Sequence, residues 1–362
     1  MPKILMKGAE AIGEAAIRAG CLSCFGYPIT PQSEVGEYMS RRLPEVGGVF
    51  VQAESEVAAS QMIYGAAGAG VRVMTTTSSP GFSLMAEAMS YLAASELPAV
   101  VVNIVRGGPG LGGILPSQGD YFQAVKGGGH GDYRCLVLAP ATVQEFVECV
   151  MKAFPLAEKY LNPVLLIGDG MIAQMMEPVD FDAVKTEPQR DVEAWATTGC
   201  KDRPRNVVEC LWLDPKLCED FNFELIEKYK KMTAEDCYFE EYELDDQPEM
   251  VVVAYGTTSR IVRTAIEELR KDGYKIGMLR PITLFPFPFA RLRELSETSH
   301  VKAFSVVEMS QGQMLEDVRW AIRDKFPVGF FCRMGGIVPS PEEVIDFLKQ
   351  EFVTRGLKGA VS

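Results

Sequence analysis

Short apolar runs alternate with amphipathic segments along the first half of the chain. A stripe of apolar residues recurring every three or four positions predicts a helix over residues 8–19, and Gly20 marks its end. Apolar runs of strand length end at Phe25, centre on Phe50, and cover residues 71–74, 99–105, 135–138 and 164–167. Strands that alternate with helices in this way predict a doubly wound α/β domain with a parallel sheet.

The pattern changes at residue 177 and again at residue 249. Between these points aromatic residues are scattered and carboxylates gather in residues 240–246, which predicts an acidic connector that packs on a partner chain. The alternation then returns, with strands at 250–255, 276–279, 303–307 and 328–331. We therefore predict a first α/β domain over residues 1–176, a connector over 177–248 and a second α/β domain over 249–362.

Three short segments that follow predicted strands carry the candidate chemistry. They are Tyr27-Pro28-Ile29-Thr30-Pro31, Glu54-Ser55-Glu56 and Arg106-Gly107-Gly108-Pro109. The carboxyl ends of parallel strands meet at one edge of a sheet, where ligands bind, so we expect a carboxylate, a hydroxyl and a guanidinium to converge on one crevice. Ordinary structural explanations stay open at this point. Glu56 also suits a first helical turn, and Thr30 before Pro31 also suits a helix cap.

The three segments resemble the signature segments of the alpha subunit of the 2-oxoacid:ferredoxin oxidoreductases, in the same order and at similar spacing. The likeness extends over nearly the whole chain. It implies a thiamine diphosphate enzyme whose cofactor lies between two polypeptides, with a pyrimidine-binding domain in residues 1–176. It also implies a second domain like the carboxy-terminal domain of transketolases. The family's reaction is oxidative decarboxylation of a 2-oxo acid, with coenzyme A as co-substrate, to acyl-CoA and CO2, while ferredoxin is reduced.

The resemblance assigns roles to three residues. Glu56 matches the glutamate that hydrogen-bonds a ring nitrogen of the aminopyrimidine and favours the imino tautomer, which removes the proton from the thiazolium carbon. Thr30 and Arg106 match residues that meet the substrate, and a guanidinium can bind the carboxylate of a 2-oxo acid through a bidentate pair. We therefore expect Glu56, Arg106 and Thr30 to be catalytic. The other cofactor contacts expected beside Glu56 are Tyr27, Pro28 and Ile29.

Four further residues are candidates for the site. Ser79 and Pro80 belong to a hydroxyl-rich loop after a predicted strand, and we expect them to contact the cofactor. Ser117 is the nearest match to a threonine that relatives carry in the loop after the arginine. His130 lies beside an aspartate in a glycine-rich loop, where a histidine either transfers protons or is simply solvated. Ser117 and His130 are expected substrate contacts.

The loop after Arg106 favours a branched-chain substrate. It resembles the loops of members that act on 2-oxo acids such as 3-methyl-2-oxobutanoate, and Leu111, Ile114 and Leu115 can line a pocket for an isopropyl tail. The loop adds no Arg or Lys that would bind the second carboxylate of 2-oxoglutarate. The alternatives are a 2-oxoglutarate or pyruvate member of the family and, in a different class, a non-catalytic scaffold subunit. A scaffold would need none of the three catalytic residues.

Two glycine-containing motifs have other interpretations. Residues 108–113 match the Gly-x-Gly-x-x-Gly dinucleotide pattern by letter, but Pro116 and the excess of glycine disfavour the helix that this fingerprint must open. Thiamine enzymes hold Mg²⁺ and the diphosphate with a Gly-Asp-Gly segment and a later asparagine. Asp169 lies in such a segment, but no asparagine follows it up to Thr198. We therefore expect no metal site on this chain and place the diphosphate and Mg²⁺ on a partner beta subunit.

Composition excludes some partners and implies others. With 36 Lys and Arg against 49 Asp and Glu, the net charge of −13 argues against nucleic acid or an anionic membrane as a partner. The nine cysteines lack the closely spaced run of a ferredoxin, so we expect [4Fe-4S] clusters on partner subunits, including gamma and delta types, and ferredoxin as a partner. Cys21 and Cys24 form a Cys-x-x-Cys pair, which fits an apolar strand better than a metal or redox site. The N-terminus lacks a signal peptide, which predicts a cytoplasmic protein.

Overall fold

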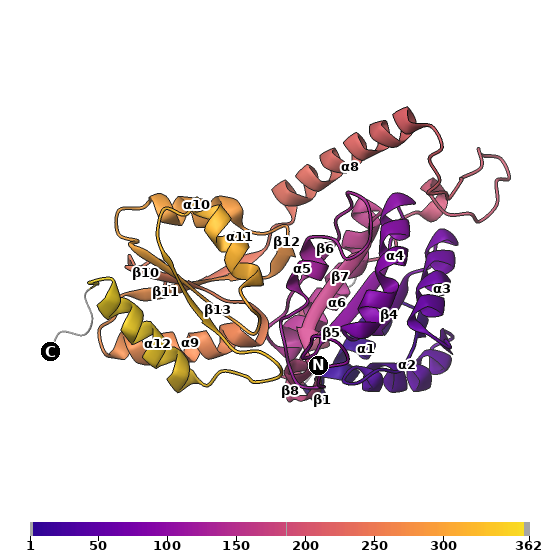
Figure 1. The fold of residues 1–362 in the computed structure, drawn as a ribbon. Helices are drawn as coiled ribbons and strands as arrows, with labels where there is room; N and C mark the ends of the chain where they lie inside the picture. The colour runs from indigo at the N-terminus through magenta and orange to yellow at the C-terminus, as the bar shows by residue number, and fades with distance from the viewer. Residues whose placement is uncertain (1–2, 186, 358–362) are drawn as a thin grey trace.

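The computed structural model describes residues 3–185 and 187–357. The chain folds into two lobes, drawn in indigo and magenta and in orange and yellow in Figure 1, each with helices packed on a sheet. The predicted α/β class is confirmed, with a seven-stranded sheet in the first lobe and a five-stranded sheet in the second. Within the described part of the chain, no helix is both long enough and apolar enough to cross a membrane.

The first lobe contains the elements predicted for residues 1–176 and several more. Its strands are β1 (Ile4–Lys7), β2 (Ser23–Gly26), β3 (Val49–Gln52), β4 (Val73–Thr77), β5 (Val100–Val105), β6 (Leu136–Leu138), β7 (Val164–Asp169) and β8 (Met176–Val179). Its helices are α1 (Gly8–Arg18), α2 (Ser33–Glu45), α3 (Glu56–Gly68), α4 (Pro80–Ala94), α5 (Tyr121–Val125), α6 (Val143–Tyr160) and α7 (Gly170–Gln174). Strands β1 and β8 pair as a small antiparallel ribbon, which the sequence pattern did not predict.

The large sheet of the first lobe includes β12 (Thr283–Phe285) and runs in the order β12-β6-β7-β5-β4-β2-β3. All its pairs are parallel except that of β12 with β6. Successive side chains of the buried strand β5 point to opposite faces, so Val100 and Val102 pack with α1, α2 and α6, while Val101 packs with α3 and α4. Because helices cover both faces, a ligand reaches this sheet at the ends of its strands.

The second lobe is a smaller α/β unit. Its strands are β9 (Phe239–Tyr242), β10 (Met250–Val253), β11 (Ile276–Pro281), β13 (Ala303–Glu308) and β14 (Val328–Cys332). Its helices are α9 (Gly256–Lys271), α10 (Phe289–Glu297), α11 (Gln313–Ala321) and α12 (Pro341–Thr354). The sheet order is β14-β13-β10-β11-β9, and only the pair of β11 with β9 is antiparallel. Each strand predicted after residue 249 is present.

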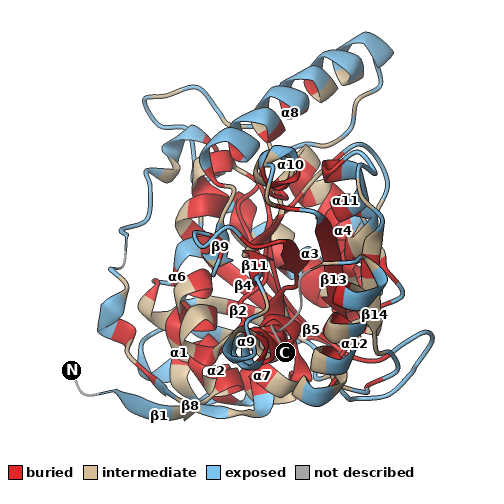
Figure 2. Cartoon of the chain, turned by 90° about the vertical axis from the view of Figure 1, so that its left-hand side faces the viewer, coloured by how far each residue is buried: buried red, intermediate tan, exposed pale blue. Residues whose placement is uncertain are grey.

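The segment over residues 177–248 has more structure than its scattered pattern indicates. It forms the 3-10 turns η1 (Phe181–Ala183) and η2 (Val192–Ala194), the long helix α8 (Pro215–Glu235) and strand β9. Figures 1 and 2 show α8 at the edge of the molecule with much of its surface exposed, although Phe221, Leu225, Tyr229 and Met232 are buried against the first lobe. Strand β9 carries part of the acidic run into the second sheet, where Glu240 forms an ion pair with Arg280 at 2.7 Å. These carboxylates therefore belong partly to the fold.

Two strands cross the predicted domain boundaries in space. Strand β9 comes from the connector and extends the second sheet, whereas β12 comes from the predicted second domain and joins the first sheet. The lobes also share buried contacts, because the rings of Tyr121 and Tyr255 lie 5.9 Å apart and both are buried. We keep residues 1–176, 177–248 and 249–362 as a proposed division of the sequence. The close junction of the lobes bears on the site described below.

Candidate active site

Glu56 begins helix α3 just beyond the carboxyl end of strand β3. The hydroxyl of Ser55 caps this helix by accepting a hydrogen bond from the Ala58 amide at 3.1 Å. Only 6% of Glu56 is exposed, and none of the described residues donates a hydrogen bond to its carboxylate. The helix dipole favours an anion in the first turn, but a buried carboxylate without a donor is costly. The position therefore suits a ligand that brings an N–H group.

Gly81, in the first turn of α4, leaves the space that the Glu56 carboxylate occupies. A Cβ atom placed on Gly81 would lie 2.5 Å from Glu56 Oε1 and closer still to Thr77 Oγ1. Among the described residues, the buried hydroxyls of β4 and the loop after it also lack hydrogen-bond partners, namely those of Thr75, Thr77 and Ser78. A carboxylate and several hydroxyls are thus left without partners at the end of β4.

Arg106 follows strand β5 and is 7% exposed. Its guanidinium donates to the carbonyl of Thr30 at 2.8 Å and to the carbonyl of Leu111 at 3.1 Å, while its buried Nε has no partner among the described residues. The structure therefore brings Arg106 and Thr30 together, as the sequence predicts. The two carbonyls hold the guanidinium in place and leave part of its donor set for an anion.

The structure excludes one of the two explanations left open for Thr30, that of a helix cap. Helix α2 begins at Ser33, and its N-cap residue is Gln32, whose side chain makes no capping hydrogen bond. The expectation that Thr30 caps this helix is wrong, because the helix begins three residues beyond it. Thr30 is exposed, and it is the backbone carbonyl, not the hydroxyl, that contacts Arg106.

A hydrogen-bonded network supports the Arg106 backbone. The Ser79 hydroxyl accepts from the Arg106 amide at 3.1 Å and donates to Asp120 Oδ2 at 2.7 Å. Asn103 donates to the same Asp120 oxygen at 2.9 Å and accepts from the Ser79 amide at 2.9 Å. Burial raises the pKa of the Asp120 carboxyl above its ordinary value, although the hydrogen bonds from Ser79 and Asn103 act against this shift.

Asp120 and Asn103 are site residues that the sequence analysis missed. Asp120 and Arg106 lie on the wall of one cleft of about 180 Å³, which Ser79, Pro80, Ser83 and residues 107–110 also line. Ser79 and Pro80, predicted as cofactor contacts, therefore lie beside Arg106. A signal was available for Asn103, because it is the one polar residue within an otherwise apolar, fully buried strand.

The structure places Ser117 and His130 in other surroundings. The Ser117 hydroxyl is buried at the junction of the lobes, where it donates to the Met309 carbonyl at 3.4 Å. His130 is exposed, and its ring lies edge-on to Tyr91, 5.9 Å away. Tyr91 is close to the far end of α4, about 15 Å along the helix from its first turn. The geometry gives no support to either residue as a substrate contact.

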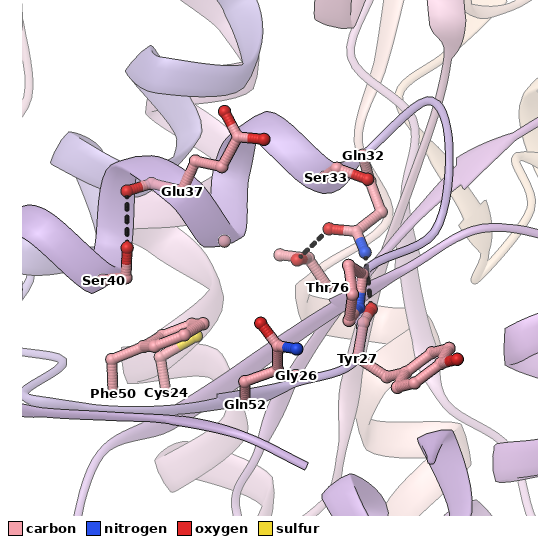
Figure 3. A pocket seen from close by; sticks show the side chains of 12 residues that line it. Cys24, Gly26, Tyr27, Gln32, Ser33, Glu37, Ser40, Phe50, Gln52 and Thr76 are labelled. Carbon is pink, nitrogen blue, oxygen red and sulfur yellow. Dashed lines mark hydrogen bonds between the residues drawn. The ribbon is translucent and has the colours of Figure 1, made fainter. Parts of the chain in front are cut away.

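A cavity of about 170 Å³ lies between α2 and the carboxyl ends of β2 and β3. Figure 3 shows Gln32 reaching from the start of α2 to Tyr27 and Thr76. The Gln32 amide donates to the Tyr27 carbonyl at 3.0 Å, and its oxygen accepts from the Thr76 hydroxyl at 2.6 Å. Gln32 is 2% exposed. These bonds fix the turn that contains Tyr27, Pro28 and Ile29 against the sheet.

Two other sequence motifs have structural roles. Asp169 Oδ1 caps helix α7 by accepting from the amides of Met171 and Ile172 at 2.9 and 3.3 Å. Burial raises the pKa of the Cys21 thiol to about 12 and also raises that of Cys24. Both cysteines are packed in the core of the first lobe, so they remain protonated thiols at neutral pH.

Family profiles and relatives identify the kind of protein that carries this site. The profile described as pyruvate flavodoxin/ferredoxin oxidoreductase, thiamine diP-bdg, matches residues 14–234, and that of pyruvate:ferredoxin oxidoreductase core domain II matches residues 248–344. The chain is 49% identical over 348 residues to ketoisovalerate oxidoreductase subunit VorB of Methanothermobacter thermautotrophicus, covering 96% of this chain and 97% of that relative. The chain belongs to the 2-oxoacid:ferredoxin oxidoreductase family.

Other similar proteins agree with this membership of the 2-oxoacid:ferredoxin oxidoreductases. The 2-oxoglutarate synthase subunit KorA of Methanocaldococcus jannaschii is 35% identical over an alignment of 365 positions, gaps included, which covers 94% of this chain and 97% of the relative. The 2-oxoglutarate:ferredoxin oxidoreductase of Magnetococcus marinus, solved with 2-oxoglutarate, coenzyme A and succinyl-CoA, matches with a TM-score of 0.85 and 28% identity, over 97% of this chain and 65% of that chain. A split gene transketolase shares the fold, with a TM-score of 0.57 and 11% identity over 97% of this chain and 99% of its own.

Proposed function

We propose that this chain is the alpha subunit of a thiamine diphosphate-dependent 2-oxoacid:ferredoxin oxidoreductase. In this proposal it oxidatively decarboxylates 3-methyl-2-oxobutanoate, a branched-chain 2-oxo acid, to acyl-CoA and CO2, with coenzyme A as co-substrate, and reduces ferredoxin. The observation that carries the proposal is the buried Glu56 carboxylate, which has no donor among the described residues and lies in the first turn of α3. The 49% identity to a ketoisovalerate oxidoreductase subunit, against 35% to a 2-oxoglutarate synthase subunit, supports the substrate.

The residues at the end of β4 fit the pyrimidine half of thiamine diphosphate. The Glu56 carboxylate and hydroxyls such as that of Thr77 lack hydrogen-bond partners within the described chain. An aminopyrimidine would supply a protonated ring nitrogen to Glu56 and polar atoms to these hydroxyls. When bound, the cofactor supplies a carbon nucleophile and an electron sink. Glu56 holds the proton at the ring nitrogen and thereby fixes the tautomer. Gly81 has no side chain and so leaves the space that this carboxylate occupies.

Arg106 fits the carboxylate of a 2-oxo acid. Its guanidinium is already oriented by the Thr30 and Leu111 carbonyls, so little conformational entropy is lost when an anion binds. The same loop presents the exposed apolar side chains of Leu111, Ile114 and Leu115, which supports an apolar rather than a charged substrate tail. A 2-oxoglutarate or pyruvate activity is the alternative outcome of the assay below.

The remaining parts of the reaction belong to partner subunits in this proposal. Asp169 caps a helix, which supports placing the diphosphate and Mg²⁺ on a beta subunit. The [4Fe-4S] clusters lie on partner subunits, which we expect to include gamma and delta types. Helix α8 exposes the apolar side chains of Leu217, Phe223 and Ile226, which supports contact between the connector and a partner.

The test is the activity of the complex after co-purification with its partner subunits. We expect Glu56→Gln to lower turnover of 3-methyl-2-oxobutanoate, measured with a dye acceptor, by about 100-fold or more while the complex stays assembled. The matched control is Glu54→Gln, because Glu54 is exposed two residues before Glu56. Full activity of Glu56→Gln would refute the proposed role. Faster turnover of 2-oxoglutarate than of 3-methyl-2-oxobutanoate would refute the substrate, and activity of the chain alone would refute the shared cofactor.

A further inference from the structure

The second lobe forms hydrogen bonds with the segment around Gln118, which follows the Arg106 loop. Gln118 is 4% exposed and donates through Nε2 to the Tyr255 carbonyl at 2.8 Å. Its Oε1 accepts from the Met309 amide at 2.8 Å, and its own amide donates to the Met309 carbonyl at 3.0 Å. Tyr255 and Met309 follow strands β10 and β13, so the segment rests on the carboxyl ends of the second sheet.

Gln313, on helix α11 of the second lobe, holds the backbone on both sides of Asp120. Its Nε2 donates to the Gly119 carbonyl at 2.7 Å, and its Oε1 accepts from the Phe122 amide at 2.7 Å. Buried Tyr121, next to Asp120, donates to Asp317 of the same helix at 2.7 Å. The second lobe therefore holds the backbone on both sides of Asp120.

The Asp120 side chain forms hydrogen bonds with residues of the first lobe and so links the two lobes. Its Oδ2 accepts hydrogen bonds from the Ser79 hydroxyl and from the Asn103 side-chain amide. The Ser79 oxygen in turn accepts a hydrogen bond from the Arg106 backbone N–H. Without Asp120, the Ser79 hydroxyl would lose its 2.7 Å acceptor and keep only the Arg106 carbonyl at 3.5 Å, so its lone pair would no longer be aimed at the Arg106 amide. A shift of a few tenths of an ångström in this backbone displaces a guanidinium that must meet a carboxylate with two parallel bonds.

We propose that Asp120 is a positioning residue for substrate binding, which acts through Ser79 on the backbone of Arg106 and which the second lobe sets in place through Gln118 and Gln313. This rests on the proposed function, because it takes Arg106 as the group that binds the 2-oxo acid. It adds a role for the second lobe, which would determine how well the first lobe binds substrate. Asp120 accepts two donors on one oxygen, which suits a fixed acceptor rather than a group that exchanges protons with the substrate.

The first test compares Asp120→Asn with Asp120→Ala in the assembled complex. An asparagine oxygen can accept from both Ser79 and Asn103, so we expect Asp120→Asn to keep the KM for the 2-oxo acid within about threefold. Asp120→Ala should raise KM about tenfold and change kcat much less. It should also weaken, by a similar factor, the binding of an unreactive substrate analogue, the 2-hydroxy acid that corresponds to the 2-oxo acid, measured by calorimetry. The melting temperature of each complex separates this effect from unfolding.

Other outcomes of this comparison overturn the proposal. If Asp120→Asn is as inactive as Asp120→Ala and loses one limb of the kcat pH profile, Asp120 transfers a proton instead. If neither variant changes KM or analogue binding, Asp120 has no part in substrate binding. If the unmodified complex does not turn over any 2-oxo acid, the proposed function is wrong. The binding of the analogue to the Asp120 variants then still shows whether Asp120 positions Arg106.

The second test examines the contribution of the second lobe. Gln313→Ala removes both bonds that flank Asp120, whereas Gln311→Ala, the matched control, removes an exposed side chain two residues away. We expect Gln313→Ala to raise KM and the dissociation constant of the 2-hydroxy acid about threefold or more, with kcat equal to that of Gln311→Ala, and the melting temperatures of both complexes separate this effect from unfolding. Equal KM values in the two variants would show that the second lobe does not act on Arg106.

Discussion

Each lobe buries a glutamate where a strand gives way to a helix, and the two differ in what surrounds them. Glu308 ends β13 and accepts hydrogen bonds from the Ser310 hydroxyl at 2.7 Å and from the amides of Met314 and Leu315 at 3.1 and 3.2 Å. Burial raises the pKa of the Glu308 carboxyl, and these donors act against the shift. Glu56 has no such donor among the described residues. The carboxylate of Glu308 has a structural role because the fold supplies its donors, whereas we propose that Glu56, which has none among the described residues, binds a ligand.

The hydroxyls in or after a central strand of each sheet show the same division. In the first lobe, the buried hydroxyls of Thr75, Thr77 and Ser78 have no partner within the described chain. In the second lobe, Thr258 and Ser259 donate to the carbonyls of Tyr255 and Gly256, at 2.8 and 2.7 Å, and Thr257 is the exception. In the second lobe, the polar groups at the edge of the sheet are thus mostly hydrogen-bonded within the protein. In the first lobe, those named here have no partner among the described residues.

The largest effect that we expect is on the free energy of unfolding, and it concerns the buried ion pair of Arg72 and Glu158 in the first lobe. Arg72 and Glu158 are both buried and form a double ion pair at 2.6 and 2.9 Å, and Arg72 also donates to the carbonyl of Glu187 in the connector. Arg72→Met would leave Glu158 buried and unpaired, so we expect the free energy of unfolding to fall by about 3–5 kcal/mol. Urea unfolding of the purified chain measures this loss.

Two controls sharpen this prediction. Arg18→Met breaks the partly exposed pair with Glu14 and should cost less than about 1 kcal/mol. The double variant that also changes Glu158→Met should recover much of the stability, because it removes the unpaired charge. A loss no greater in Arg72→Met than in Arg18→Met would show that buried charges in this lobe are not structural.

The second effect concerns the unsatisfied carboxylate itself. A Cβ at Gly81 would collide with Glu56 and Thr77, so Gly81→Ala must displace the carboxylate that we assign to the cofactor. We expect turnover by the complex to fall about 100-fold, and the affinity for thiamine diphosphate to fall with it. Gly65→Ala, in the interior of α3 with open space around it, is the matched control and should keep full activity. Unchanged turnover in Gly81→Ala would argue against a fixed position for Glu56.

The contact between Arg106 and Thr30 was predictable because it depends on local patterns. Apolar runs that alternate with helical segments fix a parallel sheet, and residues that follow its strands must share one edge. Asn103 and Asp120 could not be found in the same way. Their roles depend on contacts with each other and with Ser79, which lie 17 and 24 or more residues away in the sequence. Local propensity does not report such pairs.

The connector shows the same limit in the fold. Strand β9 contains Glu240 and Glu241, which resemble a solvated acidic run when considered alone. They become part of a strand because Arg280 and Arg291, 40 and 50 residues later, supply the opposite charges. The alternative of a cap at Thr30 failed for a related reason. The carbonyl of Thr30 serves Arg106, and the helix begins only at Ser33.

The smallest effect tests whether such a carboxylate of the second lobe is structural. Glu240 is partly buried, which acts to raise its pKa, but Arg280 and Arg263 more than offset this and lower it below the ordinary value. A lowered folded-state pKa means that the stabilisation is complete above the unfolded value of about 4.3 and is lost as the pH falls through the folded value. We therefore expect Glu240→Gln to lower stability at pH 7 by less than about 1 kcal/mol, because the side chain is 33% exposed, and to converge with the unmodified protein in acid. Melting temperatures at several pH values measure this, with Glu224→Gln on exposed α8 as the control. A difference that grew in acid would mean that the two arginines do not compensate for the burial of Glu240.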